Sequence, residues 1–283
     1  MEGSIFQYGF ILKGLLGAFF ASVTAGLAGT YIVSRRMVFL SGGISHASFG
    51  GIGIGYFAGI NPIFGAALFS IITALGVEYL SVRQKIREDS AIGILWAFGM
   101  ATGIIFIYLA PGYTPNLMSY LFGSILTVTT ADIVALGVMS VILTLYFGFF
   151  YRAILYISFD EDFARTYSSF VNGFKYITTA LMALTIVLNI RMAGVILVIS
   201  LLTIPPNIAM LFTRKYHKIV IWSIVSAFIG TTSGYAVSYF AGTPVGATII
   251  FTLVVIWVIA RLFTGTKTWN TSQGLKTSSN EKR

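Results

Sequence analysis

The sequence of 283 residues contains no cysteine and few charged side chains. The lack of cysteine excludes a small secreted scaffold held together by disulfides. Charged residues make up 10% of the chain, whereas a soluble domain carries roughly 25%, so a water-soluble globule would have too few ionic side chains to cover its surface. The Gly-x-x-x-x-Gly-Lys-Ser/Thr motif of a P-loop is also missing, so any ATP that drives this protein must be bound by another subunit.

Long apolar runs make up much of the chain. Hydrophobic residues are 57% of it, and about 20 apolar residues in a row cross the hydrocarbon core of a bilayer as a helix. The runs do not alternate with period two, which argues against a β-barrel. The sequence therefore predicts an all-α polytopic integral membrane protein, a bundle of eight or nine transmembrane helices surrounded by membrane lipid. The nine candidate spans, of which the second and sixth are short, are residues 9–33, 45–60, 63–82, 91–110, 133–150, 174–189, 193–212, 219–241 and 245–262.

The net charge of +9 comes from Lys and Arg residues at one end of the predicted helices. Nine spans place 16 of the 18 basic residues on one side and leave Lys13 and Arg191 on the other. Loops rich in Lys and Arg stay in the cytoplasm, so we expect an inner-membrane protein with its amino terminus outside and its carboxyl terminus in the cytoplasm. The charge then indicates topology, not a nucleic-acid-binding surface. We expect a transmembrane domain over residues 1–263 and a polar, disordered cytoplasmic tail over residues 264–283.

Small residues recur every four positions in the first two spans. Such stripes let helix backbones approach closely inside a membrane. We therefore expect these two helices to lie inside the bundle, away from lipid. The stripes are Gly14, Ala18, Ser22, Gly26 and Thr30 in the first span and Ala47, Gly51, Gly55 and Gly59 in the second.

Few side chains within the spans could carry chemistry. An ionisable group inside a span is costly and is therefore a functional candidate, and His46, at the start of the second span, is the best one. A neutral imidazole binds zinc and other first-row divalent ions, but a histidine hydrogen-bonded across a helix interface is an equal alternative. Gly50 and Gly53, on the same helical face, predict open space beside it. Glu78, near the inner end of the third span, either pairs across helices or extends its carboxylate to the interface.

The longest predicted inner loop, residues 151–173, contains an acidic segment. Ser158 can cap a helix whose first turn holds three carboxylates, where the helix dipole favours anions. Phe159 and Phe163 are four residues apart and would share a face of that helix. Such an acidic helix is poorly suited to anionic lipid, so we favour a docking helix for a soluble partner over one that rests on the bilayer. The carboxylates belong to Asp160, Glu161 and Asp162.

A series of short motifs follows in order along the chain. They are GTYIVSRRMVFL (29–40), ISHA (44–47) with Gly51, DSAIGIL (89–95), YLFGSIL (120–126), FDEDFA (159–164), GVILV (194–198), LTIP (202–205) and PVGA (244–247). Together these motifs resemble those of the membrane permease subunit of ATP-binding-cassette importers for zinc, manganese and, in some members, iron. The resemblance covers residues 10–262, and the order of the motifs is more specific than any one of them.

The resemblance implies a homodimer or heterodimer of permeases on two cytoplasmic ATPase subunits, supplied by an extracytoplasmic metal-binding protein. His46 would coordinate or gate the metal ion, and the acidic segment would be the coupling helix that enters a groove of the ATPase. The permease itself would be no enzyme and would need no cofactor. The implied coupling residues are Phe159, Asp160, Glu161, Phe163 and Ala164.

Two positions depart from the pattern of this family. Its members commonly carry an aspartate four residues before the histidine, where this chain has Gly42, and Ser168 replaces a glycine after the coupling helix. The sequence predicts a permease that moves a divalent metal ion inward by alternating access, with zinc preferred over manganese and iron. A metal-chelate permease of the same family, an ion-gradient-driven carrier and a membrane enzyme are the alternatives.

Overall fold

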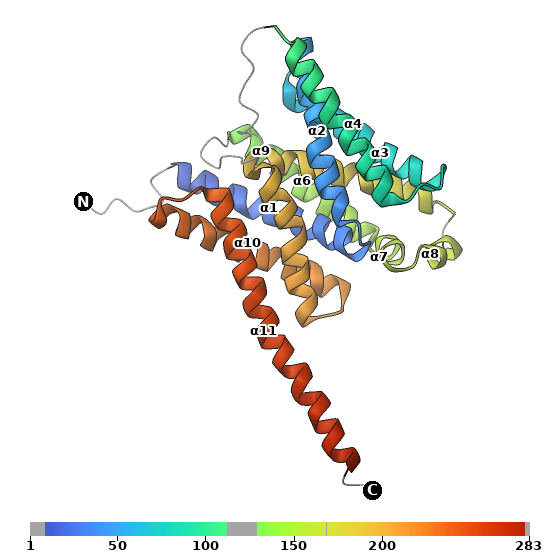
Figure 1. Cartoon of the computed structure of the whole chain (residues 1–283), viewed down its shortest axis with the longest axis vertical. Helices are drawn as coiled ribbons and strands as arrows, with labels where there is room; N and C mark the ends of the chain where they lie inside the picture. Colours follow the sequence, from blue (N-terminus) through green and yellow to red (C-terminus); the bar gives the residue numbers. More distant parts are fainter. Residues whose placement is uncertain (1–8, 112–128, 168, 281–283) are drawn as a thin grey trace, which may run out of the picture.

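The chain is helical nearly throughout the part of it that the structure describes (Figure 1). The computed structural model describes residues 9–111, 129–167 and 169–280, and no strand occurs in these ranges, which confirms the all-α prediction. The motif at residues 120–126 and Ser168 lie outside the described residues. The helices are α1 (Gly9–Ser34), α2 (Val38–Ala58), α3 (Pro62–Val82), α4 (Glu88–Leu109), α6 (Thr130–Phe149), α7 (Tyr151–Phe159), α8 (Glu161–Tyr167), α9 (Val171–Phe212), α10 (Tyr216–Ala241) and α11 (Val245–Asn280).

Seven of these helices are long and apolar enough to cross a membrane. One of them, α9, has 42 residues, and a straight helix of that length would measure about 63 Å, twice the roughly 30 Å of a hydrocarbon core. Gly194 divides it, because its φ of 76° and ψ of 161° interrupt the helix in a region that glycine alone enters readily. The two arms run in different directions in Figure 1 and match the predicted sixth and seventh spans. Together with α2, the described residues contain the nine predicted membrane helices.

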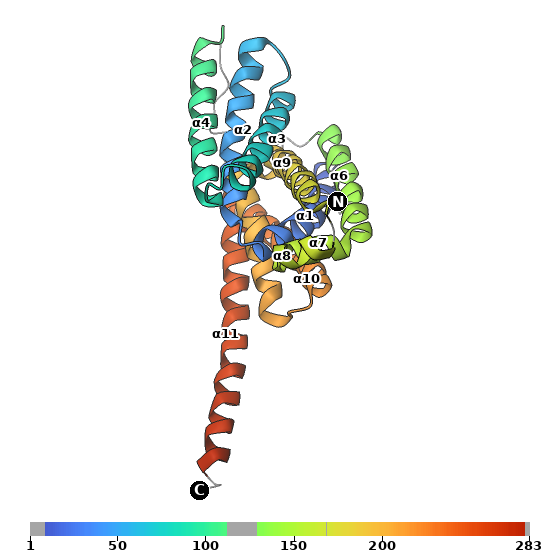
Figure 2. The same ribbon diagram turned by 90° about the vertical axis from the view of Figure 1, so that its right-hand side faces the viewer.

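Helices α1 and α2 lie inside the bundle, as their stripes of small residues predict. In α1, 72% of the most apolar stretch is buried, against 17% in α4 and in α11. Helix α2 packs with α3 and α4, and Figure 2 shows the three as one group. A Cβ on Gly51 would collide with the backbone of Gly65 in α3, and one on Gly99 of α4 would lie 2.6 Å from the Cα of Ala47. Glycine at these positions allows the backbones to touch.

The last helix, α11, extends beyond the membrane-spanning part of the chain. Its apolar stretch is Val245–Thr264, and the ribbon continues as helix through Asn280 and leaves the bundle (Figure 1). The sequence predicts an irregular tail for residues 264–283. The boundary at residue 263 and the disorder of residues 264–283 stay predictions.

The inner segment 151–173 forms two short helices where the sequence predicts one. Helix α7 ends at Phe159, and the carboxylate of Asp160 accepts a hydrogen bond of 2.9 Å from the backbone N–H of Phe163 in α8. Asp160 is therefore the capping residue, because the hydroxyl of Ser158 donates a hydrogen bond back into α7. The shared face expected for the two phenylalanines is also wrong, since they lie on different helices.

Candidate functional site

The imidazole of His46 lies half-buried on α2 and stacks on the indole of Trp96 from α4. The ring centroids are 4.6 Å apart and the planes differ by 4°. Its Nδ1 atom is buried and has no hydrogen-bond partner among the described residues. A hydrogen bond across a helix interface, the alternative to a ligand role, is therefore not seen at this nitrogen. The lone pair or proton of Nδ1 is thus not used by another described residue.

The open space expected beside His46 is filled by α3 and α4. A Cβ on Gly50 would lie 2.7 Å from the ring of Phe69 in α3 and 3.0 Å from the carbonyl oxygen of Gly99 in α4, and one on Gly53 would collide with the backbone of Gly103. Both glycines thus serve close packing of α2 against these helices. The expectation was wrong because it considered only the side chains of α2 itself.

Gly42, one helical turn before His46, has more free space around it than Gly50 or Gly53. A Cβ at this position would meet only the Cδ1 atom of Ile199, at 3.7 Å, which is an ordinary van der Waals contact. The aspartate common at this position in the resembled family is therefore not excluded by backbone packing.

His46 belongs to no cluster of metal-binding side chains in the described part of the chain. Within those ranges, no group of three or more His, Asp or Glu side chains is placed to hold a metal ion. Glu78 is already engaged in ion pairs. A metal ion at His46 would thus take its other ligands from backbone carbonyls, from water or from a second copy of the chain.

The end of the bundle that is expected to face the cytoplasm, here called the inner end, contains a network of ion pairs centred on Glu78 of α3. The Glu78 side chain is 1% exposed and lies 3.4 Å from Arg35, which follows α1, and 3.5 Å from Lys175 of α9. Thr179 donates a hydrogen bond of 2.7 Å to the same carboxylate. Arg35 also pairs with Glu88 at the start of α4, at 3.2 Å. Of the two roles considered for Glu78, the structure shows the cross-helix pair.

Glu161 connects α8 to this network. Its Oε2 atom lies 3.0 Å from Nζ of Lys175 and 4.0 Å from Arg35, and its Oε1 atom lies 2.7 Å from Arg165. Burial raises the pKa of Glu161, but the hydrogen bond and charge of Lys175, with Arg165 and Arg35, outweigh burial and hold that pKa below its usual range. The carboxylate is therefore ionised at neutral pH.

The two short inner helices present an exposed surface that is both aromatic and acidic, here called the docking surface. Phe159 is 62% exposed and Phe163 is 51% exposed. Ala164, also an expected coupling residue, is instead buried, and Glu161 turns toward the ion pairs. The five expected coupling residues thus divide into three that are exposed (Phe159, Asp160 and Phe163) and two that face the bundle (Glu161 and Ala164). The docking surface consists of Phe159, Asp160, Asp162 and Phe163.

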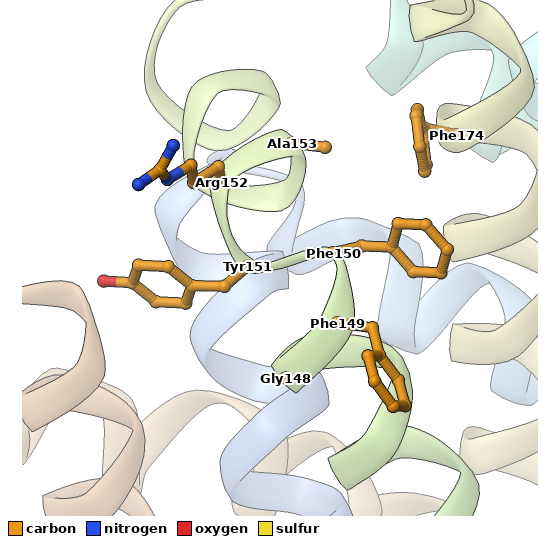
Figure 3. Close-up of a pocket in the computed structure, with 7 residues that line it drawn as sticks. All are labelled: Gly148, Phe149, Phe150, Tyr151, Arg152, Ala153 and Phe174. Atoms are coloured by element: carbon orange, nitrogen blue, oxygen red, sulfur yellow. The ribbon is translucent and has the colours of Figure 1, made fainter.

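A cavity of about 580 Å³ lies where α6 meets α7 (Figure 3). The rings of Phe149, Phe150 and Phe174 line it, and Arg152 points away from Phe174. The aromatic lining can take an apolar group such as a lipid chain. None of the residues expected to bind metal or to couple to an ATPase lies in this cavity.

The chain is similar to known transport proteins over most of its length. A family model described as the ABC 3 transport family matches residues 7–264. The manganese transport system membrane protein MntC of Listeria innocua is 32% identical over 263 residues, 93% of each chain. A probable metal transport system membrane protein of Chlamydia pneumoniae is 36% identical over 245 residues, 84% of each chain.

A solved structure supports the same assignment. PsaBC from Streptococcus pneumoniae, in complex with Fab, matches with a TM-score of 0.79 and 27% identity, over 90% of this chain and 91% of that one. The order of motifs, the all-helical fold and these matches agree. The chain therefore belongs to the ABC 3 transport family, as a multi-pass membrane permease subunit and not an enzyme.

Proposed function

We propose that this chain forms the membrane pathway of an ATP-binding-cassette importer that moves a divalent first-row metal ion into the cell. The observation that carries the proposal is His46, whose Nδ1 atom has no partner among the described residues. It is the only histidine of α2, and histidine is the commonest metal ligand among side chains. The names of the relatives, which are metal transport proteins, support a metal ion as cargo.

Zinc is the preferred ion in this proposal, followed by manganese and iron. Imidazole nitrogen suits zinc, whereas manganese favours carboxylate and carbonyl oxygens. Gly42 supplies no carboxylate one turn from His46. Manganese is the second candidate, because three relatives are named for its transport.

Alternating access would be driven by a partner ATPase that binds at the docking surface. The chain has no P-loop of its own, so the nucleotide must act from another subunit. Exposed phenylalanines are typical of surfaces that become buried when a partner binds. The neighbouring carboxylates of Asp160 and Asp162 would favour a partner groove that carries positive charge. Closure of the ATPase would then move α7 and α8 against the bundle.

The proposed transporter contains two permease copies and receives its cargo from an extracytoplasmic binding protein. With the basic ends of the helices in the cytoplasm, the amino terminus lies outside and the docking surface lies inside. The little-buried helices α4 and α11 offer apolar faces to lipid or to the second copy. A second copy could also complete the ligand shell around His46.

Metal uptake into liposomes that contain the complete transporter tests the proposal. His46→Ala should abolish uptake of zinc and manganese while expression and assembly remain normal. His217→Ala is the matched control, because His217 is exposed near the start of α10, and it should transport normally. Normal uptake by His46→Ala would reduce His46 to a residue that packs on Trp96.

Omission of the ATPase subunits distinguishes the main alternative. An importer of this class loses all uptake without them. Metal uptake that persists without the ATPase and follows an ion gradient would instead support a carrier of a different class.

A further inference from the structure

The ion pairs at the inner end of the bundle divide into two parts, each without net charge. The first part joins α1, α3, α4 and α9 through two positive and two negative side chains, and we call it the bundle cluster. The second part belongs to α8 and contains one carboxylate and one guanidinium. The bundle cluster consists of Arg35, Glu78, Glu88 and Lys175, and the α8 pair consists of Glu161 and Arg165.

The bundle cluster is largely buried, so its stability depends on the balance of positive and negative charge within it. The side chains of Arg35, Lys175 and Glu78 are 7%, 4% and 1% exposed, and an uncompensated charge at such a depth is strongly unfavourable. If Glu161 left, Lys175 would still have Glu78, and Arg35 would still have Glu78 and Glu88. If α8 moved away, hydrogen bonds would break, but every buried charge of the bundle cluster would keep a partner of opposite charge.

We propose that Glu161 is a releasable latch, a positioning residue that holds α8 on Lys175 in one state of the transport cycle and frees it in another. The proposal rests on the proposed function, because an ATPase on the docking surface supplies the force. Glu161 is suited to release because its side chain is 32% exposed, whereas that of Lys175 is 4% exposed. Lys175 is shared between two carboxylates, one fixed in the bundle and one on the movable helix.

The position of Lys175 explains how the latch reaches the ion pathway. It lies in the second turn of α9, in the arm before Gly194. This arm is hydrogen-bonded to α1 through Asn189 and Thr24 and to α3 through Thr179 and Glu78. Helix α3 packs on α2, which carries His46. A displacement of α8 that acts on Lys175 would therefore act on an arm that is bonded to the helices around His46.

A double-mutant cycle in the complete reconstituted transporter tests the latch, with the number of metal ions moved per ATP hydrolysed as the readout. Glu161→Gln should lower this ratio about tenfold, because one charge-assisted hydrogen bond is worth about that factor. Lys175→Gln should lower it at least as much, because it removes the ion pair with Glu78 as well as the one with Glu161. The double variant should be no worse than Lys175→Gln alone, since Lys175→Gln already removes the contact with Glu161. Factors that multiply to about a hundredfold would overturn the proposal.

Asp89→Asn is the matched control for charge removal. Asp89 is an exposed carboxylate on the same side of the bundle and pairs only with exposed Arg87 among the described ion pairs. Its substitution should leave the transport ratio unchanged. A loss equal to that of Glu161→Gln would show that surface charge in general, and not the latch, sets the ratio.

A distance measurement on the assembled transporter tests the latch without reference to transport. The chain has no cysteine, so spin labels at Thr166→Cys, an exposed position of α8 outside the docking surface, and at Tyr79→Cys in α3 are the only labels in this subunit. The α8–α3 distance distribution should be narrow in the parent and broad in Lys175→Gln. An unchanged distribution would overturn the latch.

The failure of the proposed function would look different. If Phe163→Ala and Asp160→Asn leave stimulation of the ATPase unchanged, the docking surface is wrong, while the distance measurement still decides whether Lys175 holds α8.

Discussion

The inner end of the bundle and the segment around His46 use polar side chains in opposite ways. At the inner end, six charged side chains from five parts of the chain form ion pairs with one another. Around His46, a single imidazole stacks on Trp96 and has an unpartnered Nδ1 atom. Paired charges fix the position of helices, whereas a pathway must bind its ion weakly enough to release it. The comparison therefore separates a region that sets geometry from the region that we propose binds the transported ion.

The largest expected effect is the loss of transport without loss of stability in His46→Ala. Stacking between the imidazole and the indole is worth about 1 kcal/mol, so the purified subunit should unfold at nearly its parental temperature while uptake disappears. Thermal unfolding in detergent and uptake in liposomes check the two halves of this expectation. A large drop in the unfolding temperature would instead place His46 among the structural residues.

The opposite result is expected at the inner end. Glu78→Ala leaves Lys175 and Arg35 short of a buried partner and should destabilise the subunit by about 3 kcal/mol or more. The control Asp89→Asn removes an exposed carboxylate, whose ion pair is worth about 0 to 1 kcal/mol. Chemical or thermal unfolding of the purified subunit gives both values. Equal destabilisation by the two variants would contradict the special role of the network.

A smaller effect is expected on the docking surface. Phe163→Ala removes a ring that is 51% exposed and lies with its centroid 5.0 Å from that of the Tyr156 ring, so the subunit should fold normally. Stimulation of the ATPase by the permease should fall about tenfold, as for an aromatic residue at the centre of an interface. The exposed apolar substitution Phe240→Ala, near the outer end of α10, is the matched control and should leave stimulation intact.

The fold was largely predictable from local sequence, and the ion-pair network was not. Continuous apolar runs and the small-residue stripes predict the membrane helices and the buried places of α1 and α2. The network joins Arg35 to Glu78 and Glu78 to Lys175, and no helical or loop spacing links residues so far apart in the chain. Only the packing of α1, α3 and α9 brings them together.

The local errors have equally specific causes. Ser158 and Asp160 are both good capping residues, and the break between α7 and α8 decides in favour of Asp160. Gly50 and Gly53 look like open space when α2 is considered alone, but they are the places where α4 approaches. These features depend on a neighbouring element that the local sequence does not contain.

A more modest effect should follow from Gly42→Asp. The position has room for a side chain, and a carboxylate one turn from His46 adds the type of oxygen ligand that manganese favours. Competition between zinc and manganese for uptake should therefore shift several-fold toward manganese. Gly42→Asn, which adds an uncharged oxygen, should shift it less. An unchanged ratio in both variants would place this position outside the ion pathway.

The smallest expected effect concerns pH. Because the pKa of Glu161 is held below its usual range, its contribution is complete above the ordinary carboxyl pKa of about 4.3 and is lost as pH falls through the lower, folded value. The groups that face it are Lys175, Arg165 and Arg35. The protection factors of α8 amides in hydrogen–deuterium exchange, which are corrected for the intrinsic pH dependence of exchange, should therefore stay constant from neutrality to about pH 5. Protection that is lost near neutral pH would contradict an ionised Glu161.

One measurement tests the central claim most directly: zinc uptake into liposomes that contain the wild-type subunit with its partner ATPase, compared with the His46→Ala variant, in the presence and absence of ATP. The account predicts uptake that requires both ATP and His46. Uptake by wild-type protein without ATP, or undiminished ATP-driven uptake by His46→Ala, would contradict it.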